Sequence, residues 1–290
     1  MKKKPLVTIA IPVFNCQNSI RSAISSVINQ TFPDFEILIY DDGSTDNTIN
    51  IIKEFSDSRI RLFSDGCNKG IAYRLNQLIE LASGVYFFRM DGDDLMFPNR
   101  VEKQVSCLLE NPDVDIIGSS AIVIDENNII IGKRGELNRN RNFDDLFMSA
   151  RFIHPTVAGK IEWFRRWRYD ENLSGCEDMD LWIRSFKESI FADCNEPLLF
   201  YRESLKMRLK TYLKRQRLLF KYSWSKRKLM DHWCHFVILL CKLVVALVAA
   251  IILHIVRCDY RMIRRRNMDL PKESINSYNN ILEMVLMKNK

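Results

Sequence analysis

The chain has 290 residues, a hydrophobic content of 47% and a formal net charge of +7. This length suits one large domain with an appendage, or two modest domains, and the apolar content is ample for a core. The eight cysteines are scattered, with no C-x-x-C pair and no Cys/His spacing typical of zinc. That pattern argues against a cysteine zinc module and favours a reduced, cytosolic setting.

The amino-terminal sequence MKKKPLVTIAIPVF superficially resembles a signal peptide, with a basic start and an apolar stretch. Pro12 and Asn15 interrupt the stretch early, and no small-residue cleavage site follows. We therefore expect residues 6–13 to form the first strand of the fold.

Strand-like and helix-like segments alternate along the first half of the chain. Apolar segments rich in β-branched residues predict strands at 6–13, 35–40, 59–63 and 85–90. Amphipathic segments between them predict helices at 19–30, 48–55, 71–82 and 100–110. This alternation predicts an α/β sheet with parallel strands and helices on its faces. Residues 115–135 predict a hairpin that turns at 126–128, so the sheet is expected to be mixed.

Polar clusters follow each of the four predicted strands. Ligands bind beyond the carboxyl ends of the strands in such sheets, so these clusters are expected to meet in one site. The clusters are Asn15, residues 41–44, residues 65–68 and residues 91–94.

Three carboxylates, Asp91, Asp93 and Asp94, directly follow the apolar run 85–90. Carboxylates this close repel one another, so a divalent cation such as Mg²⁺ or Mn²⁺ is one explanation. A polar turn that caps the helix starting near Pro98 is the other, and these residues alone fit both. The coincidence of four polar clusters at one edge favours the metal.

Residues 41–48, DDGSTDNT, supply hydrogen-bond acceptors for a nucleobase or ribose, and they also offer caps for the next helix. An EF-hand is a poor fit, because Ile52 stands at the twelfth loop position when counting starts at Asp41. The chain has no G-x-G-x-x-G after its first strand and no Walker A sequence, so dinucleotide and P-loop chemistry fit poorly.

Six motifs occur in an order that resembles family 2 glycosyltransferases with the GT-A fold. The resemblance covers roughly residues 5–203 and is strongest to bacterial enzymes that build surface polysaccharides. It implies a Rossmann-like, mixed and mostly parallel sheet with flanking helices. The motifs are VTIAIPVFN (7–15), DDGSTDNT (41–48), NKGIAYRLN (68–76), MDGDD (90–94), HPT (154–156) and CEDMDLWIR (176–184).

The resemblance also implies roles for individual residues. Asp41 is expected to bind the base, normally uracil, and Asp91 and Asp93 match the D-x-D signature for the ribose and for Mn²⁺ or Mg²⁺. Asp178, in the Glu177-Asp178 pair, matches the general base. The residues expected to bind substrate are Pro12, Asn15, Asp41, Asp42, Asn68, Arg74, Asn76, Asp91, His154 and Trp182.

The chemistry of sugar transfer agrees with these roles. A divalent cation can neutralise a leaving diphosphate, and a carboxylate on the opposite face can deprotonate the acceptor hydroxyl. The spacing of Leu181, Trp182 and Phe186 places Asp178 at the start of a helix. The helix dipole favours acids in a first turn, which explains Glu177, Asp178 and Asp180 equally well.

Two further features have a structural and a functional interpretation. His154 is either a strand-end histidine before a proline turn or a residue near the diphosphate or acceptor, as the resemblance implies. Trp163, Trp167 and Trp182 could stack on an acceptor sugar, although aromatic residues at this density are more often part of a core. The sequence does not decide whether the basic segment 160–170 contacts the acceptor.

Residues 236–256 form an apolar stretch of 21 residues with one full charge, Lys242. A helix of this length spans ~31 Å, close to the hydrocarbon thickness of a bilayer. Ten Lys or Arg and no acid lie in residues 206–228, and further arginines lie at 257–266, so anionic lipid should attract both flanks. A buried helix in an accessory bundle is the alternative, and a single span, a re-entrant hairpin and an interfacial helix all fit the membrane interpretation. The basic segment shows no nucleic-acid-binding module, so no nucleic-acid partner is expected.

The sequence therefore predicts a metal-dependent, inverting glycosyltransferase at the cytoplasmic side of a bacterial inner membrane, peripheral or single-pass. The expected donor is a nucleotide sugar, with UDP favoured, and the acceptor a lipid-linked glycan or oligosaccharide. A nucleotidyltransferase that uses the paired aspartates and a non-catalytic membrane scaffold are the rival functions. The expected parts are a catalytic domain at 1–203, a basic helical segment at 204–233, an apolar membrane-associated helix at 234–257 and a polar, basic tail at 258–290.

Overall fold

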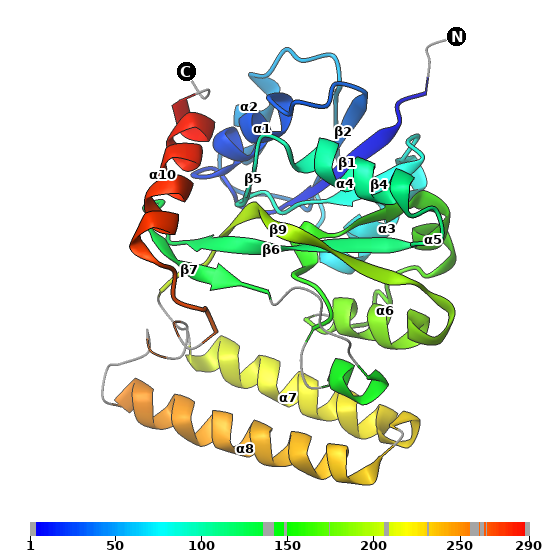
Figure 1. Ribbon diagram of the computed structural model, residues 1–290, viewed down its shortest axis with the longest axis vertical. Helices are drawn as coiled ribbons and strands as arrows, with labels where there is room; N and C mark the ends of the chain where they lie inside the picture. The colour runs from blue at the N-terminus through cyan, green and yellow to red at the C-terminus, as the bar shows by residue number, and fades with distance from the viewer. Residues whose placement is uncertain are drawn as a thin grey trace.

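A nine-stranded mixed sheet organises the chain in the computed structural model (Figure 1). The strands lie in the order β3-β2-β1-β4-β8-β6-β9-β5, with β7 paired to β6. The structure describes residues 4–135, 142–147, 150–173, 175–205, 209–230, 232–255, 261, 264 and 266–287.

The first four strands are mutually parallel and match the four predicted ones. β1 pairs with both β2 and β4, and β2 pairs with β3. Their bounds are Val7–Val13 for β1, Phe35–Asp41 for β2, Ile60–Ser64 for β3 and Tyr86–Arg89 for β4. Their carboxyl ends therefore reach the same edge of the sheet, as the sequence predicts.

Antiparallel pairs appear beyond β4. The predicted hairpin is confirmed as β6 with β7, and the Asp125 carboxylate accepts hydrogen bonds from the N–H groups of Asn127 and Ile129 within its turn. β8 joins the hairpin to β4, whereas β9 lies parallel to β6. These strands are β5 at Leu95–Met96, β6 at Ile116–Ile124, β7 at Ile130–Arg134, β8 at Ala158–Lys160 and β9 at Phe191–Arg202.

Helices cover both faces of the sheet because alternate residues of the parallel strands face opposite sides. Ile9 and Ile11 of β1 pack in one core with α1, α2 and α4, while Ala10 packs in a second core with α3, α5 and α6. The helices of the first core are α1 at Ile20–Ile28, α2 at Thr48–Lys53 and α4 at Arg100–Glu110. Those of the second are α3 at Ile71–Leu81, α5 at Ile161–Arg166 and α6 at Glu177–Ser185. Short 3₁₀ turns are η1 at Phe143–Phe147, η2 at His154–Thr156 and η3 at Phe186–Glu188.

Two long helices, α7 and α8, lie side by side beneath this body (Figure 1). α7 at Leu209–Lys226 carries the basic segment, η4 at Arg227–Leu229 follows it, and α8 at Trp233–Ile255 carries the apolar stretch. Tyr222 of α7 and Leu239 of α8 join the core that contains α6. The α7–α8 hairpin is thus anchored to the α/β body through one side of each helix.

The segment predicted as a polar, basic tail contains a further helix, α10, at Lys272–Met287. Leu282 and Val285 are buried against Leu95, Phe97 and other residues of the β5–β6–β9 region, and α10 also contacts α1. Residues 272–287 therefore return to the sheet, and α10 packs beside the α/β body (Figure 1).

Candidate active site

The loops that follow β1, β2, β3 and β4 lie at the carboxyl edge of the parallel strands. The first two are joined by side-chain hydrogen bonds: the Asn15 N–H donates to Ser44 Oγ (2.9 Å), and Asn15 Oδ1 accepts from the Thr45 N–H (2.9 Å). Asn15 has a left-handed φ of 51°, which turns the chain sharply after the strand. Pro12 lies inside β1, opposite Tyr40 of β2. Asn15 thus fixes the shape of the edge where a nucleotide is expected.

Asp41 ends β2 and is fully buried. Its carboxylate accepts hydrogen bonds from the N–H groups of Gly43 and Ser44 and from Ser64 Oγ (3.0 Å). Gly43 has φ 75°, and a Cβ there would lie 2.9 Å from a backbone carbon, so only glycine fits this turn. Asp41 therefore shapes the floor of the predicted base pocket.

Asp42 organises the loop before α3. Its carboxylate accepts hydrogen bonds from the N–H groups of Lys69 (2.7 Å) and Gly70 (3.0 Å) and from Arg74 Nε (2.7 Å). The buried Arg74 guanidinium also binds Asp65 through two nitrogens (2.6 and 3.0 Å). Burial opposes the charge of Arg74, but the hydrogen bonds to Asp65 and Asp42 outweigh it and raise its pKa. This network holds the predicted nucleotide wall rigid.

The two predicted asparagines differ in position. Asn68 is exposed in the loop between β3 and α3. Asn76 is buried on α3, where its amide exchanges two hydrogen bonds with the backbone of Tyr169 (2.9 and 3.0 Å) and donates to Glu171 (2.8 Å). Asn68 is therefore available to a ligand, whereas Asn76 positions Tyr169.

Asp91, Asp93 and Asp94 form a carboxylate cluster after β4, with one oxygen from each within 4.8 Å of the others. Asp94 Oδ1 accepts a hydrogen bond from the Arg202 N–H (2.8 Å). Its buried Oδ2 has no hydrogen-bond partner among the described residues. Hard oxygen donors at this spacing, one of them buried and unsatisfied, fit Mg²⁺ or Mn²⁺. The cluster can therefore hold the predicted cation.

Electrostatics support that fit. Loss of hydration, reinforced by repulsion from Asp91, raises the pKa of Asp93 to about 6. Burial and then repulsion from Asp93 raise the pKa of Asp94 well above its ordinary value. Without a cation, Asp93 and Asp94 therefore bind protons more readily than ordinary aspartates do, and a bound cation would compete with those protons.

The three acids at the start of α6 have different surroundings. Asp180 is buried and accepts hydrogen bonds from Arg184 Nε (2.5 Å) and from the Tyr222 hydroxyl (3.0 Å). Glu177 accepts one from the Gly175 N–H (2.5 Å), which closes its own turn. Asp178 is half-buried, and its carboxylate accepts a hydrogen bond from the Met179 N–H (2.8 Å). Asp180 therefore has a structural role, because Arg184 and Tyr222 each donate a hydrogen bond to its carboxylate.

Arg89, the last residue of β4, links the two acidic groups. It is almost fully buried and pairs with Asp91 (2.5 Å), while its Nε and Nη1 have no hydrogen-bond partner among the described residues. Burial is the largest cause of the raised pKa of Asp178 and of Glu177, and the charge of Arg89 counteracts both. It also counteracts the raised pKa of Asp93. Arg89 therefore pairs directly with the carboxylate cluster through Asp91, and its positive charge also favours the ionised forms of the α6 acids.

His154 sits beside this group in η2. Its Nε2 lies 2.8 Å from the Tyr169 hydroxyl. Burial and then the charge of Arg89 lower the pKa of His154 well below its ordinary value, so the imidazole is neutral. His154 therefore belongs to the buried support of the site.

Trp182 is fully buried among aromatic rings, stacked on Trp163 at 5.9 Å and edge-on to Phe152 at 5.1 Å. Stacking on a sugar requires an exposed ring face, which Trp182 lacks in this arrangement. Its position is that of a core residue behind the site.

Sequence reasoning grouped Asp94 with Asp91 and Asp93, but it missed Arg89, Tyr169 and Arg202. An arginine inside an apolar strand directly before three aspartates was a usable signal, because buried arginines almost always have a partner. Tyr169 gave no such signal, since its place depends on Asn76 of α3, 93 residues away. A separate groove of about 370 Å³, at the Phe97–Asn99 turn and α10, contains none of the predicted site residues.

Comparison with known proteins agrees with this geometry. Residues 8–171 match the family described as Glycosyl transferase family 2. The UDP-Glc:alpha-D-GlcNAc-diphosphoundecaprenol beta-1,3-glucosyltransferase WfgD of Escherichia coli is 40% identical over 128 residues, which is 44% of this chain and 50% of WfgD.

Two solved structures share the fold at low identity. TarS of S. aureus, residues 1–349 in complex with UDP, has a TM-score of 0.59 and 16% identity, over 82% of this chain and 70% of that one. The mannosyltransferase PcManGT of Pyrobaculum calidifontis, in complex with GDP-Man and Mn²⁺, has a TM-score of 0.59 and 17% identity, over 98% and 81%. This likeness confirms the predicted GT-A architecture.

Proposed function

The chain belongs to glycosyl transferase family 2, and we propose that it moves a sugar from a nucleotide sugar, with UDP favoured, to an acceptor hydroxyl with inversion at the anomeric carbon. One observation carries the proposal: directly after β4, at the carboxyl edge of the parallel strands, three carboxylates form a cluster suited to a cation, with the buried Arg89 paired to one of them. The complexes of TarS with UDP and of PcManGT with GDP-Man support a nucleotide donor.

The donor site would be built on the carboxyl edge of β1–β4. The loops fixed by Asn15, Asp41 and the Asp42–Arg74 pair would enclose the base and ribose. A divalent cation held by Asp91, Asp93 and Asp94 would supply Lewis-acid stabilisation of the diphosphate leaving group. Because Arg89 already pairs with Asp91, it would keep that carboxylate oriented toward the diphosphate.

Asp178 would act as the general base. Its carboxylate would accept the proton of the acceptor hydroxyl while the acceptor oxygen forms a bond to the anomeric carbon. The bond between that carbon and the diphosphate oxygen would break, and the nucleoside diphosphate would leave with the electron pair. Burial raises the pKa of Asp178, which strengthens it as a base, whereas Asp180 is committed to Arg184 and Tyr222.

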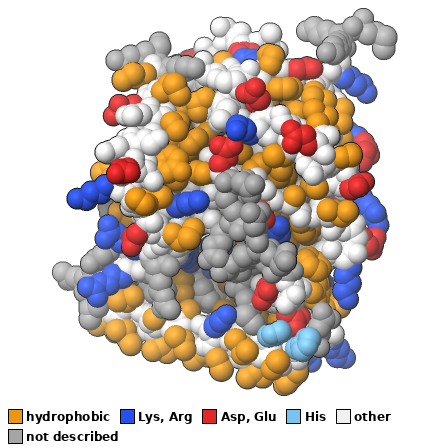
Figure 2. Space-filling model, in the orientation of Figure 1, with side chains coloured by type: hydrophobic (Ala, Val, Ile, Leu, Met, Phe, Trp, Pro, Cys, Tyr) orange, Lys and Arg blue, Asp and Glu red, His pale blue; other side chains and the backbone are white. Residues whose placement is uncertain are grey.

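We propose a lipid-linked acceptor at a membrane surface, on the cytoplasmic side where nucleotide sugars are made. WfgD, by its name, acts on a diphosphoundecaprenol-linked sugar. α8 is long and apolar enough to cross a membrane, with a mean hydropathy of 3.1 over its most apolar 18 residues. Figure 2 shows hydrophobic side chains along the lower edge of the molecule, over α8. The exposed ones include Val237, Ile238, Val244, Val245, Val248, Ile251, Ile252 and Ile255.

The packing of α8 favours a helix that lies flat in the membrane interface. α7 runs beside α8 and carries Lys210, Lys214, Arg215, Arg217 and Lys221. A spanning α8 would carry α7 into the hydrocarbon, at about 2.5–3.5 kcal/mol for each such charge on insertion scales. A flat hairpin instead places these charges near anionic headgroups.

Thiol labelling tests this orientation. In a chain whose other cysteines are serine, the native Cys234 and a cysteine at position 255 should both react with an impermeant reagent added to one side of sealed vesicles. Reaction at only one of the two positions would show that α8 spans the bilayer.

The donor assignment is tested by thermal stabilisation. A ligand that binds the native state at 100 times its Kd adds about 2.7 kcal/mol to the free energy of unfolding. We expect a UDP-sugar or UDP to raise the Tm by several degrees with Mn²⁺ or Mg²⁺, and much less with a chelator or in the Asp93→Ala variant. No shift from any nucleotide or nucleotide sugar would remove the basis of the proposal.

A further inference from the structure

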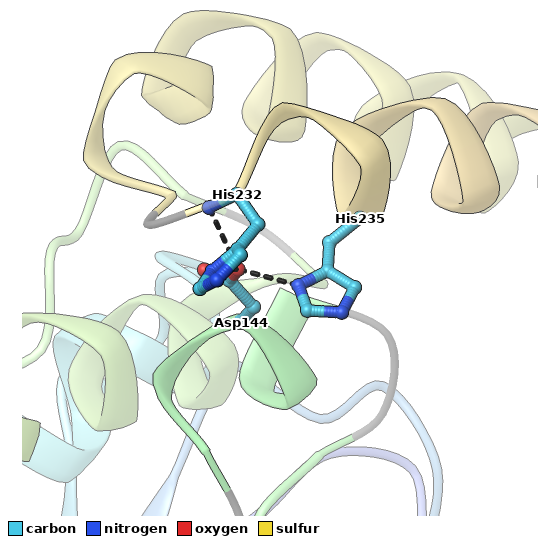
Figure 3. A group of neighbouring side chains, drawn as sticks. All are labelled: Asp144, His232 and His235. Atoms are coloured by element: carbon cyan, nitrogen blue, oxygen red, sulfur yellow. Dashed lines mark hydrogen bonds and ion pairs between the residues drawn. The ribbon is translucent and has the colours of Figure 1, made fainter.

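A second group of metal-binding side chains lies far along the chain from the carboxylates after β4. Asp144 of η1 meets His232 and His235 at the start of α8 (Figure 3). His235 Nδ1 lies 2.6 Å from Asp144 Oδ2, and His232 Nδ1 lies 3.5 Å from the same oxygen. All three donor atoms are within 4.8 Å of one another.

We propose that Asp144, His232 and His235 form a binding site for Zn²⁺. Two imidazole nitrogens and one carboxylate oxygen are a donor set that suits zinc rather than Mg²⁺. Tetrahedral zinc takes such ligands at about 2.0–2.2 Å, which separates neighbouring donor atoms by about 3.3 Å. Relative to this spacing, His235 Nδ1 is about 0.7 Å too close to Asp144 Oδ2 and His232 Nδ1 is about 0.2 Å too far, so both lie within an ångström of it.

The surroundings of the three residues resemble those of a built site. Asp144 is almost fully buried, and its Oδ2 also accepts a hydrogen bond from the His232 backbone N–H (3.1 Å), which orients the carboxylate. The side chains of His235 and His232 are 34% and 67% exposed, so an ion can enter and a water can fill a fourth position. Zinc sites of this kind, with three protein ligands, keep one position open.

The position of the site gives it a role. Asp144 belongs to the body that contains the proposed active site, whereas both histidines begin α8, the proposed membrane helix. Zn²⁺ would therefore fasten one end of the apolar helix to the body, beside the core contact of Leu239. The free energy of metal binding adds to the stability of the folded arrangement. The zinc site would therefore hold the α7–α8 hairpin in a fixed position relative to the proposed active site.

A simple hydrogen bond between His235 and Asp144 is the competing explanation, and one variant separates the two. In His235→Gln the side-chain amide can still donate to Asp144, but an amide is a poor zinc ligand. His254→Ala, which removes the exposed histidine at the other end of α8, is the matched control. All proteins carry Asp93→Ala, so that the carboxylates after β4 do not add to the count.

The full chain is purified in detergent, stripped with a chelator and titrated with Zn²⁺ alone, with bound zinc measured against a chromophoric competitor. We expect one tight equivalent, retained in His254→Ala and weakened at least ~10-fold in His235→Gln and His232→Ala. Co²⁺ should give visible absorption in the parent and control and lose it in both histidine variants. Circular dichroism confirms folding, and His235→Gln serves if His232→Ala does not fold. Equal zinc affinity in the parent, control and His235→Gln proteins, or no tight equivalent in the parent, would overturn the proposal.

Discussion

The assignment of Asp178 as the base is tested by comparing Asp178→Asn with Asp180→Asn. Both residues are acids in the first turn of α6, so the helix dipole affects both. The structure nevertheless predicts opposite outcomes for catalysis and for stability, because the two carboxylates have different partners.

The magnitudes follow from those partners. Asn at position 178 can still accept the hydrogen bond from the Met179 N–H, so the cost to stability should stay below ~1 kcal/mol. Loss of a general base typically costs 10²–10⁴-fold, so kcat should fall at least ~100-fold, which is about 2.7 kcal/mol in the activation free energy. Asn at position 180 weakens the buried bonds to Arg184 and Tyr222, at about 1–3 kcal/mol of unfolding free energy.

The assay is sugar transfer under donor saturation, with the Tm and donor affinity measured on the same preparations. Asp178→Asn should keep the Tm and donor Kd of the parent while kcat falls. Asp180→Asn should lose several degrees of Tm while its folded fraction keeps most of its kcat. Near-full activity in Asp178→Asn would refute the general-base role, and a larger kcat loss in Asp180→Asn would assign that role to Asp180 instead.

Three further predictions concern the cation, the pH profile and the membrane. Asp93→Ala should abolish transfer and remove the metal dependence of UDP binding measured by calorimetry; unchanged metal dependence would contradict the cation site. The pKa of Asp178 is raised by burial, and a base works only when deprotonated, so activity should fall on acidification at a pH above the ordinary range of an aspartate; a profile whose acid limb stays at that ordinary range would count against it. Changing the exposed Val244, Val245, Val248 and Ile252 to Ser should let high salt release the full chain from anionic vesicles, whereas the same change at the exposed Val85, Leu109, Ile129 and Ile190 should not. Complete release of the unchanged chain by high salt would refute the apolar contribution.

Local sequence patterns predicted the first half of the fold well. Runs such as 35–40 and the helical spacing of 71–82 identify β2 and α3, because each signal lies within one element. β9 was missed because the sequence from Cys194 to Pro197 interrupts its apolar run, and it forms by pairing with β6 and β5, which lie far away in the sequence. α10 was missed because its first half, residues 272–280, is mostly polar, and only Leu282 and Val285 are buried.

The grouping of Asp91, Asp93 and Asp94 could be predicted because all three follow directly after the apolar run of β4. The different surroundings of Asp178 and Asp180 in α6 could not be predicted, because Asp180 is held by Tyr222, which lies 42 residues later in the chain. The same limit applies to Asp144 and His235, which are 91 residues apart and meet only once α8 packs on the body. Side chains paired over long separations leave no local pattern for a sequence to reveal.

Product analysis is the most direct test of the central claim that this chain is a sugar transferase. The full chain is incubated with a UDP-sugar, Mn²⁺ and a diphosphoundecaprenol-linked sugar, and the nucleotide products are separated and quantified. The account predicts free UDP in a 1:1 ratio to glycosylated lipid, with neither formed by Asp178→Asn. Pyrophosphate among the products would instead indicate nucleotidyl transfer and contradict the account.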